Sequence, residues 1–308
     1  MAPLRCRRDP CGVICLILTY FSVFYADYVV IQYVLIPAYS DSVWCTLHGS
    51  VFNLILLLLL ACHSKAVFSD PGMVPLPDTA IDFSDLRSQS SRMNERGCEG
   101  WTVCSRCETY RPPRAHHCRV CQRCIRRMDH HCPWINNCVG ELNQKYFIQF
   151  LFYTGMASLY SMVLVVSAWV WRIRNERDGE AEKEEGEETP SKHLIVAHYI
   201  ILLVESVLFG VFVMVIFYDQ LVSIITDETP IEQMRNRLMI KDKGSSSSSS
   251  SSSSSQPPHH LTHTRKPKLA LLREVFGRGS VFCWLLPLHS SPPSVGGISY
   301  SALPDYNV

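Results

Sequence analysis

The chain has 308 residues, 47% of them hydrophobic, and its 29 basic residues nearly balance 28 acidic ones to a formal net charge of +1. This near-neutral charge indicates no nucleic-acid partner, and without a GxxxxGKS or GxGxxG motif the common phosphate-loop and dinucleotide-binding classes are excluded. The apolar residues are gathered in long runs, which is typical of membrane spans.

Two such runs lie near the start of the chain, behind a basic N-terminal arm at residues 1–12. Residues 13–36 exceed the roughly 7–15 apolar residues of a secretory signal and match the roughly 20 that cross a bilayer, so they are predicted as the first transmembrane helix. Residues 47–67 are predicted as the second, and the turn Asp70-Pro71-Gly72 follows them.

The later part of the chain contains two further predicted spans. Residues 146–171 carry no charge, and residues 194–218 carry a single acidic residue, Glu205. The loop between them, residues 172–193, is rich in acidic residues. The serine run at residues 245–255 is a low-complexity stretch, and we expect it to be a disordered spacer.

Positive charge predicts the orientation of the four spans. Residues 1–12, 69–145 and 219–308 carry several Lys and Arg residues and residues 37–46 carry none, so the first three are predicted as cytosolic. Residues 172–193 are then a luminal loop, although the arginines at its start disagree with the rule. The predicted fold class is an all-α membrane protein with four transmembrane helices and a cytosolic, zinc-stapled cysteine-rich domain between helices 2 and 3.

Eight of the 14 cysteines and four histidines lie between Cys98 and Cys138. Paired ligands about three residues apart are typical of zinc sites, and thiolates persist as ligands in the reducing cytosol. Two sites with three cysteines and one histidine each would leave at least one cysteine over. Spacing alone does not decide which one. The paired positions are Cys104 with Cys107, then His117, Cys118, Cys121 and Cys124, then His131 and Cys138.

The run Asp129-His130-His131-Cys132 places a carboxylate, two imidazoles and a thiol in consecutive positions. An imidazole that takes the thiol proton, itself oriented by a carboxylate, makes a cysteine nucleophilic. The alternative is that all four residues are metal ligands or hold the ligands in place. Residue types alone leave both interpretations open.

The same run continues through Cys132-Pro133-Trp134 to Gly140 and lies between predicted spans, and this combination resembles the DHHC-type protein S-acyltransferases, in particular their four-span Golgi-type members. The resemblance is closest over residues 104–149. It implies that Cys132 is the acyl-accepting nucleophile, His130 the general base and Asp129 the residue that orients His130.

The resemblance also implies two structural Zn²⁺ ions and leaves Cys98 and Cys132 without metal. The implied ligands of the first ion are Cys104, Cys107, His117 and Cys124, and those of the second are Cys118, Cys121, His131 and Cys138. Residues Thr229-Pro230-Ile231-Glu232 stand where the family has a Thr-Thr-x-Glu motif, so proline replaces a threonine.

The implied activity is transfer of a long fatty acyl group, palmitoyl, from acyl-CoA to protein cysteines by a ping-pong mechanism. Its partners would be palmitoyl-CoA as co-substrate, membrane-associated proteins that carry cysteines, and the lipid bilayer. By the resemblance, Arg111, Arg114 and His116 would bind the CoA phosphates. The alternative for these arginines is a face toward anionic lipid.

The expected location is the Golgi or endoplasmic reticulum membrane, with both termini and the cysteine-rich domain cytosolic. The last residues, Tyr306-Asn307-Val308, have the form of a PDZ-binding terminus and indicate a PDZ protein as a further partner. Two rival functions stay open from the residues: a catalytically inactive zinc-domain scaffold, and an ion transporter that uses Asp27 and Glu205.

Overall fold

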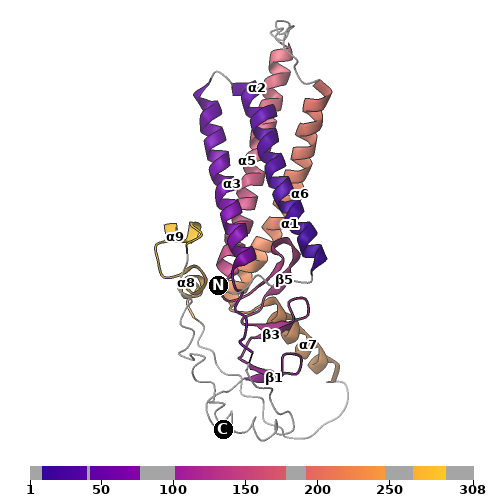
Figure 1. Cartoon of the computed structure of the whole chain (residues 1–308), viewed down its shortest axis with the longest axis vertical. Helices are drawn as coiled ribbons and strands as arrows, with labels where there is room; N and C mark the ends of the chain where they lie inside the picture. The colour runs from indigo at the N-terminus through magenta and orange to yellow at the C-terminus, as the bar shows by residue number, and fades with distance from the viewer. Residues whose placement is uncertain (1–8, 40–41, 77–100, 178–191, 247–265, 289–308) are drawn as a thin grey trace, which may run out of the picture. The chain divides into compact units, whose positions relative to one another are not determined.

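A computed structural model describes residues 9–39, 42–76, 101–177, 192–246 and 266–288 of the chain (Figure 1). These residues divide into two compact units, each described here by itself. The first unit comprises the described residues within 1–69, 131–137 and 146–220, and the second comprises those within 70–130, 138–145 and 221–308.

The first unit is a bundle of four long helices, which run side by side in Figure 1. All four are long and apolar enough to cross a membrane, which confirms the predicted fold class of a mostly helical protein with four candidate membrane spans. The first consists of α1, a π-helix and α2 in succession. The bounds are α1 Pro10–Val29, η1 Val30–Leu35, α2 Ile36–Tyr39, α3 Val43–Phe68, α5 Gln144–Arg177 and α6 Lys192–Thr226.

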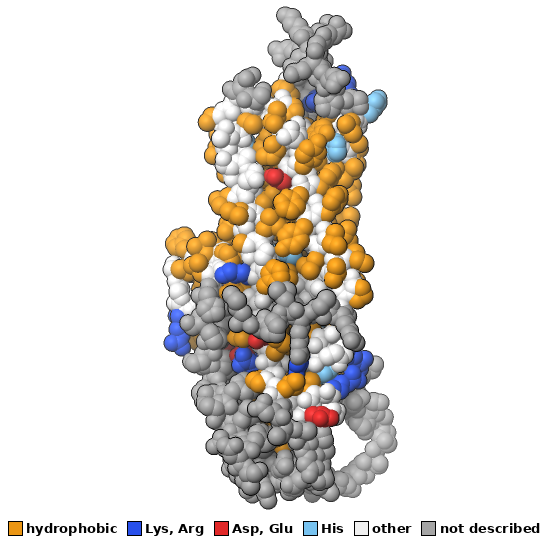
Figure 2. Space-filling view, viewed as in Figure 1, with side chains coloured by type: hydrophobic (Ala, Val, Ile, Leu, Met, Phe, Trp, Pro, Cys, Tyr) orange, Lys and Arg blue, Asp and Glu red, His pale blue; other side chains and the backbone are white. Residues whose placement is uncertain are grey.

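Polar side chains and small residues join the helices of this bundle. The Ser161 and Ser206 hydroxyls lie 2.8 Å apart between α5 and α6, and a Cβ added at Gly210 would lie 3.5 Å from Ser158, so these two helices approach closely. Many large apolar side chains face outward instead, such as Phe21 and Leu208 at 67% and 66% exposure (Figure 2). An apolar outer surface of this kind fits a lipid environment.

The second unit contains short antiparallel hairpins. β1 Thr102–Cys104 pairs with β2 Thr109–Arg111, and β3 His116–Cys118 pairs with β4 Arg123–Ile125. A third pair is β5 His130–Cys132 with β6 Asn137–Val139, and residues 131–137 of this hairpin are assigned to the bundle. Strands of three residues bury little apolar surface, so these hairpins need another source of stability.

The turn Asp70-Pro71-Gly72 is fastened to the second unit. One Asp70 carboxylate oxygen accepts the Gly72 and Met73 amides at 2.8 Å each, and Gly72 has a φ of +100°, a conformation that favours glycine. A Cβ at Gly140 would lie 2.4 Å from the Pro71 carbonyl oxygen. Because only glycine permits this approach, any larger residue at position 140 would displace the turn.

Among the residues that the structure describes after α6, there are three further helices. Thr229 caps α7, since its hydroxyl accepts the Glu232 amide at 3.4 Å while Glu232 accepts the Thr229 amide at 2.8 Å. Pro230 is the first residue of α7, where a proline is favourable. The bounds are α7 Pro230–Ser246, α8 Lys268–Phe276 and α9 Val281–Leu285.

Several predictions concern residues outside the described part of the chain. These are most of the basic arm, residues 178–191 of the acidic loop, Cys98, and the PDZ-like terminus. Of the serine run, Ser245 and Ser246 belong to α7, and the remainder is also outside. The predicted sides of the membrane stay predictions.

Candidate active site and metal clusters

Residues 131–137, here called the nucleophile segment, belong to the helical bundle and include Cys132. The Cys132 side chain is largely buried and lines a predominantly apolar cavity together with residues from α1, α3, α5 and α6. The cavity walls include Thr19, Leu59, Phe147 and Phe212. A thiol at the wall of such a cavity can meet the reacting end of a long apolar molecule.

The cavity also has polar residues in its lining. Glu205, Ser206 and Ser161 are among them. Glu205, one of the two acidic residues at predicted membrane depth, thus faces the same cavity as Cys132. Asp27 is not among the cavity-lining residues.

The first turn of α1 holds one side of the nucleophile segment. The Asp9 carboxylate lies 3.1 Å from Nε2 of His131. A Cβ added at Gly12 would lie 2.5 Å from Oδ1 of Asn136, so the α1 backbone rests directly on the segment. The backbone of Asn136 is in the left-handed conformation, with a φ of 44°, which asparagine tolerates better than most residues do.

The end of α3 holds the other side. His63, fully buried, places Nε2 3.0 Å from the Trp134 carbonyl oxygen, so this nitrogen carries the proton and donates it. The Asn137 side-chain amide donates to the carbonyls of Ala66, Val67 and Ser69 at 3.0 to 3.2 Å. These carbonyls are at the helix end, where intrahelical partners run out. The segment around Cys132 is therefore fixed from two helices.

Asp129 and His130 form a close pair within the second unit. Nδ1 of His130 lies 2.5 Å from Oδ2 of Asp129, whose side chain is 2% exposed. A carboxylate at Nδ1 favours the tautomer that carries its proton on Nδ1, in which Nε2 is the basic nitrogen. Side chains alternate along β5, so His130 and Cys132 lie on one face of the strand and His131 on the other.

Two groups of cysteines and histidines are close enough to hold a metal ion each, because within each group the ligand atoms lie within 4.8 Å of one another. Cys132 belongs to neither. The groups coincide with the two ligand sets that the resemblance implies. The first cluster is Cys104, Cys107, His117 and Cys124, and the second is Cys118, Cys121, His131 and Cys138.

The spacing within the clusters is close to that around a tetrahedral zinc ion. With Zn–S near 2.3 Å and Zn–N near 2.0 Å, neighbouring ligand atoms should lie about 3.5 to 3.8 Å apart. Nδ1 of His117 lies 3.6 Å from Sγ of Cys104 and 3.1 Å from Sγ of Cys107. Sγ of Cys121 and Sγ of Cys138 lie 3.4 Å apart. Burial, then the neighbouring thiols, raise the pKa of Cys124, an unfavourable arrangement for thiolates without a cation.

Two of the predicted CoA-binding residues share a basic cleft in the second unit. Arg111 and His116 line it with Arg106 and Arg119. Nε of Arg111 donates to the Thr102 hydroxyl at 2.6 Å, and its terminal nitrogens have no hydrogen-bond partner among the described residues.

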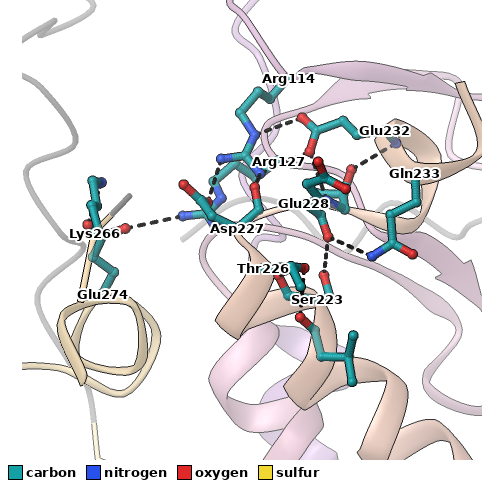
Figure 3. Close-up of polar contacts among 12 residues, drawn as sticks. Arg114, Arg127, Ser223, Thr226, Asp227, Glu228, Glu232, Gln233, Lys266 and Glu274 are labelled. Carbon is teal, nitrogen blue, oxygen red and sulfur yellow. Dashed lines mark hydrogen bonds and ion pairs between the residues drawn. The ribbon is translucent and has the colours of Figure 1, made fainter. Parts of the chain in front are cut away.

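Arg114 lies instead in a network of ion pairs that the sequence analysis missed (Figure 3). Its guanidinium donates to the carboxylates of Glu232 at 2.7 Å and Asp227 at 2.8 Å. Arg127 lies 3.2 Å from Asp227 and 3.7 Å from Glu274, a residue of α8. These five residues, the arginine network, join three parts of the second unit that are distant in sequence.

The positive charge of Arg114 lowers the pKa values of two carboxyl groups in the arginine network. Burial tends to raise the pKa of Asp227 and of Glu232, but hydrogen bonds from Arg114 and its positive charge outweigh burial, and both pKa values lie below their ordinary values. Arg114, Arg127 and Asp227 also have positive φ angles of 65°, 41° and 55°. In the sequence, the feature that pointed toward this network was Glu232, which lies three residues after the helix-capping Thr229.

The DHHC palmitoyltransferase family model matches residues 98–237 of the chain. Palmitoyltransferase ZDHHC3 of Homo sapiens is 40% identical over 229 residues, which cover 74% of this chain and 72% of that protein. The chain belongs to the DHHC palmitoyltransferase family. This membership confirms the predicted family and the predicted protein S-acyltransferase function.

Other members of the family show the same likeness. Palmitoyltransferase ZDHHC7 of Rattus norvegicus is 34% identical over 229 residues, which cover 74% of this chain and 70% of that protein. A probable protein S-acyltransferase 15 of Arabidopsis thaliana is 45% identical over 120 residues, covering 39% of this chain and 45% of that protein. The likeness to the plant enzyme is therefore confined to a shorter stretch of both chains.

Proposed function

We propose that this protein transfers a long fatty acyl group, palmitoyl, from acyl-CoA to protein cysteines through a thioester on Cys132. The observation that carries the proposal is the position of Cys132. It lies outside both metal clusters and at the wall of an apolar cavity in the helical bundle. Attack of its thiolate on acyl-CoA exchanges one thioester for another, and a second thiol then takes the acyl group in a ping-pong sequence.

The cavity would receive the acyl chain. Each buried methylene contributes about 0.8 kcal/mol, so a long chain gains most of its binding energy from an apolar wall such as Phe147 and Leu59 supply. The thioester carbon would then lie beside Cys132, which shares this wall. The rigid support of the nucleophile segment by His63 and Asn137 favours a fixed position for the thiol.

His130 would act as the general base. The hydrogen bond between its Nδ1 and Asp129 leaves Nε2 as the nitrogen that accepts a proton, first from Cys132 and later from the incoming substrate thiol. Asp129 would hold the imidazole in this orientation and stabilise the imidazolium. The alternation of β5 supports this role, since His130 and Cys132 lie on the same face of the strand.

The two clusters would each hold a structural Zn²⁺ ion. Each cluster offers four protein ligands, the closed set that structural zinc sites use. Zinc in these sites would link hairpins too short to fold on an apolar core. The chemistry of acyl transfer is assigned to Cys132, His130 and Asp129.

The CoA phosphates would bind at the basic cleft through Arg111 and His116. Arg114, the third residue implied by the resemblance, is instead paired with two carboxylates. Anionic lipid is the alternative ligand for these arginines.

For location we propose a multi-pass protein of the Golgi or endoplasmic reticulum membrane, with both termini and the cysteine-rich domain in the cytosol. The distribution of positive charge and the thiol ligands support this orientation. A PDZ protein that binds Tyr306-Asn307-Val308 is a further proposed partner.

Incubation of the purified full-length protein with an alkyne-tagged palmitoyl-CoA tests the proposed function. The wild type should acquire a label that hydroxylamine removes, and Cys132→Ala should acquire none at position 132 and transfer none to a substrate peptide. Label that resists hydroxylamine, or transfer that persists in Cys132→Ala, would overturn it. Ion flux in reconstituted vesicles that survives Cys132→Ala would favour the transporter.

A further inference from the structure

Two cysteines near the start of α1 lie close to the nucleophile segment. The contacts of Asp9 with His131 and of Gly12 with Asn136 place the first turn of α1 directly against this segment. Cys11 is exposed and Cys15 is half-buried. Because residues four apart in a helix share a face, Cys11 and Cys15 lie on the same side of α1.

Cys15 is also placed toward Cys132. Thr19, one helical turn after Cys15, lines the same cavity as Cys132, and its hydroxyl donates to the Cys15 carbonyl at 2.9 Å. Gly12, whose backbone rests on Asn136, is three residues before Cys15 and so lies on the same side of α1. Both cysteines belong to the helical bundle, so this arrangement lies within one compact unit.

We propose that Cys15 is a modification site that receives the fatty acyl group from Cys132 of the same chain. The proposal rests on the proposed function, because the donor is the Cys132 thioester. The Cys15 sulfur would attack the acyl carbon, its proton would pass to the His130 imidazole, and the bond from the acyl carbon to the Cys132 sulfur would break. The leaving Cys132 thiolate would then recover that proton. One thioester replaces another, and no further reagent is needed.

The apolar surroundings favour this acceptor over a water molecule. An acyl chain in the cavity contacts α1 through Thr19 and Val23, so transfer to Cys15 keeps the chain against the same helix. Cysteines at the membrane boundary are common sites of reversible acylation. The product would be a form of the protein whose first span carries its own lipid while Cys132 is free for another cycle.

The test counts acylated cysteines after the full-length protein is loaded with alkyne-tagged palmitoyl-CoA. Mass spectrometry of peptides that contain Cys15 locates the label, and exchange of thioesters for a mass tag counts it. The variants are Cys15→Ser, Cys132→Ser and, as a matched control, Cys45→Ser. Cys45 is also half-buried, but about 30 Å of α3 separates it from Ala66, whose carbonyl contacts the nucleophile segment.

We expect label on Cys15 in the wild type and in Cys45→Ser, none on Cys15 in Cys132→Ser, and unchanged loading of Cys132 in Cys15→Ser. Label on Cys132 with none on Cys15 would overturn this inference and leave the proposed function intact. Equal label on Cys15 in Cys132→Ser would also overturn it, because the transfer would not pass through Cys132. Label that appears on Cys132→Ser only after mixing with active Cys15→Ser protein would show transfer between chains and contradict transfer within one. A wild type without label on Cys132 would contradict the proposed function itself.

Discussion

The helical bundle and the cysteine-rich hairpins are stabilised by different kinds of interaction. In the bundle, helices such as α6, with 35 residues, satisfy their own backbone groups and present large apolar side chains outward. The hairpins have strands of only three residues, and four of the eight side chains in their two small buried clusters are cysteines. The bundle is therefore suited to lipid, whereas the hairpins have little apolar core of their own.

The largest expected effect comes from breaking a cluster. Cys118→Ala removes one of four ligands from the second cluster, and structural zinc in small domains contributes about 10 to 16 kcal/mol of folding free energy. We expect the zinc content to fall by about half and the hairpins to become sensitive to protease, with the bundle helices retained by circular dichroism. Cys132→Ala is the control and should keep its zinc. Equal zinc loss in both variants would contradict the assignment of Cys132.

The second effect comes from the arginine network, which joins the hairpins to α7 and α8. Arg114→Ala leaves the half-buried carboxylates of Asp227 and Glu232 without their main partner, a loss of about 1 to 3 kcal/mol. The midpoint of thermal unfolding should decrease, and zinc content should not. A double-mutant cycle with Glu232→Gln measures the coupling. A coupling energy near zero would show that the network contributes little.

The third effect lies in the bundle. His63→Leu removes the donor to the Trp134 carbonyl and leaves a buried acceptor without its partner, at a cost of about 1 to 3 kcal/mol. We expect slower acylation of Cys132 with the zinc content unchanged. His63→Gln, whose amide can donate, should restore part of the rate. Unchanged rates of Cys132 acylation in both variants would show that the hydrogen bond to the Trp134 carbonyl does not contribute to catalysis.

The smallest effect concerns pH. The pKa values of Asp227 and Glu232 are depressed in the folded protein, so their contribution to stability is complete above their unfolded pKa values of about 3.9 and 4.3 and is lost as the pH falls through the lower folded values. Thermal unfolding measured between neutral pH and pH 3 should therefore show a shallower acid dependence in Arg114→Ala than in the wild type. Parallel curves would contradict the assignment of these shifts to Arg114.

The resemblance and the structure agree on more of the site than residue spacing could predict. From spacing alone, any of several cysteines was a candidate for the free thiol, because Cys118 and Cys121 are as closely spaced as Cys104 and Cys107. The geometry sorts the ligands into two clusters because β3 and β4 bring His117 and Cys124 opposite each other. The sequence alone could not predict that His131 faces away from His130 and Cys132, because this follows only once these residues are known to form a strand.

The sequence by itself determined the four spans, because an apolar run of sufficient length satisfies its backbone groups only as a helix in a bilayer. Only the tertiary structure decided which distant residues contact each other: Asp9 beside His131 and Arg114 beside Glu232 are 122 and 118 residues apart in the chain. Such contacts leave no periodic pattern, because they depend on where folded elements meet and not on how neighbouring residues repeat.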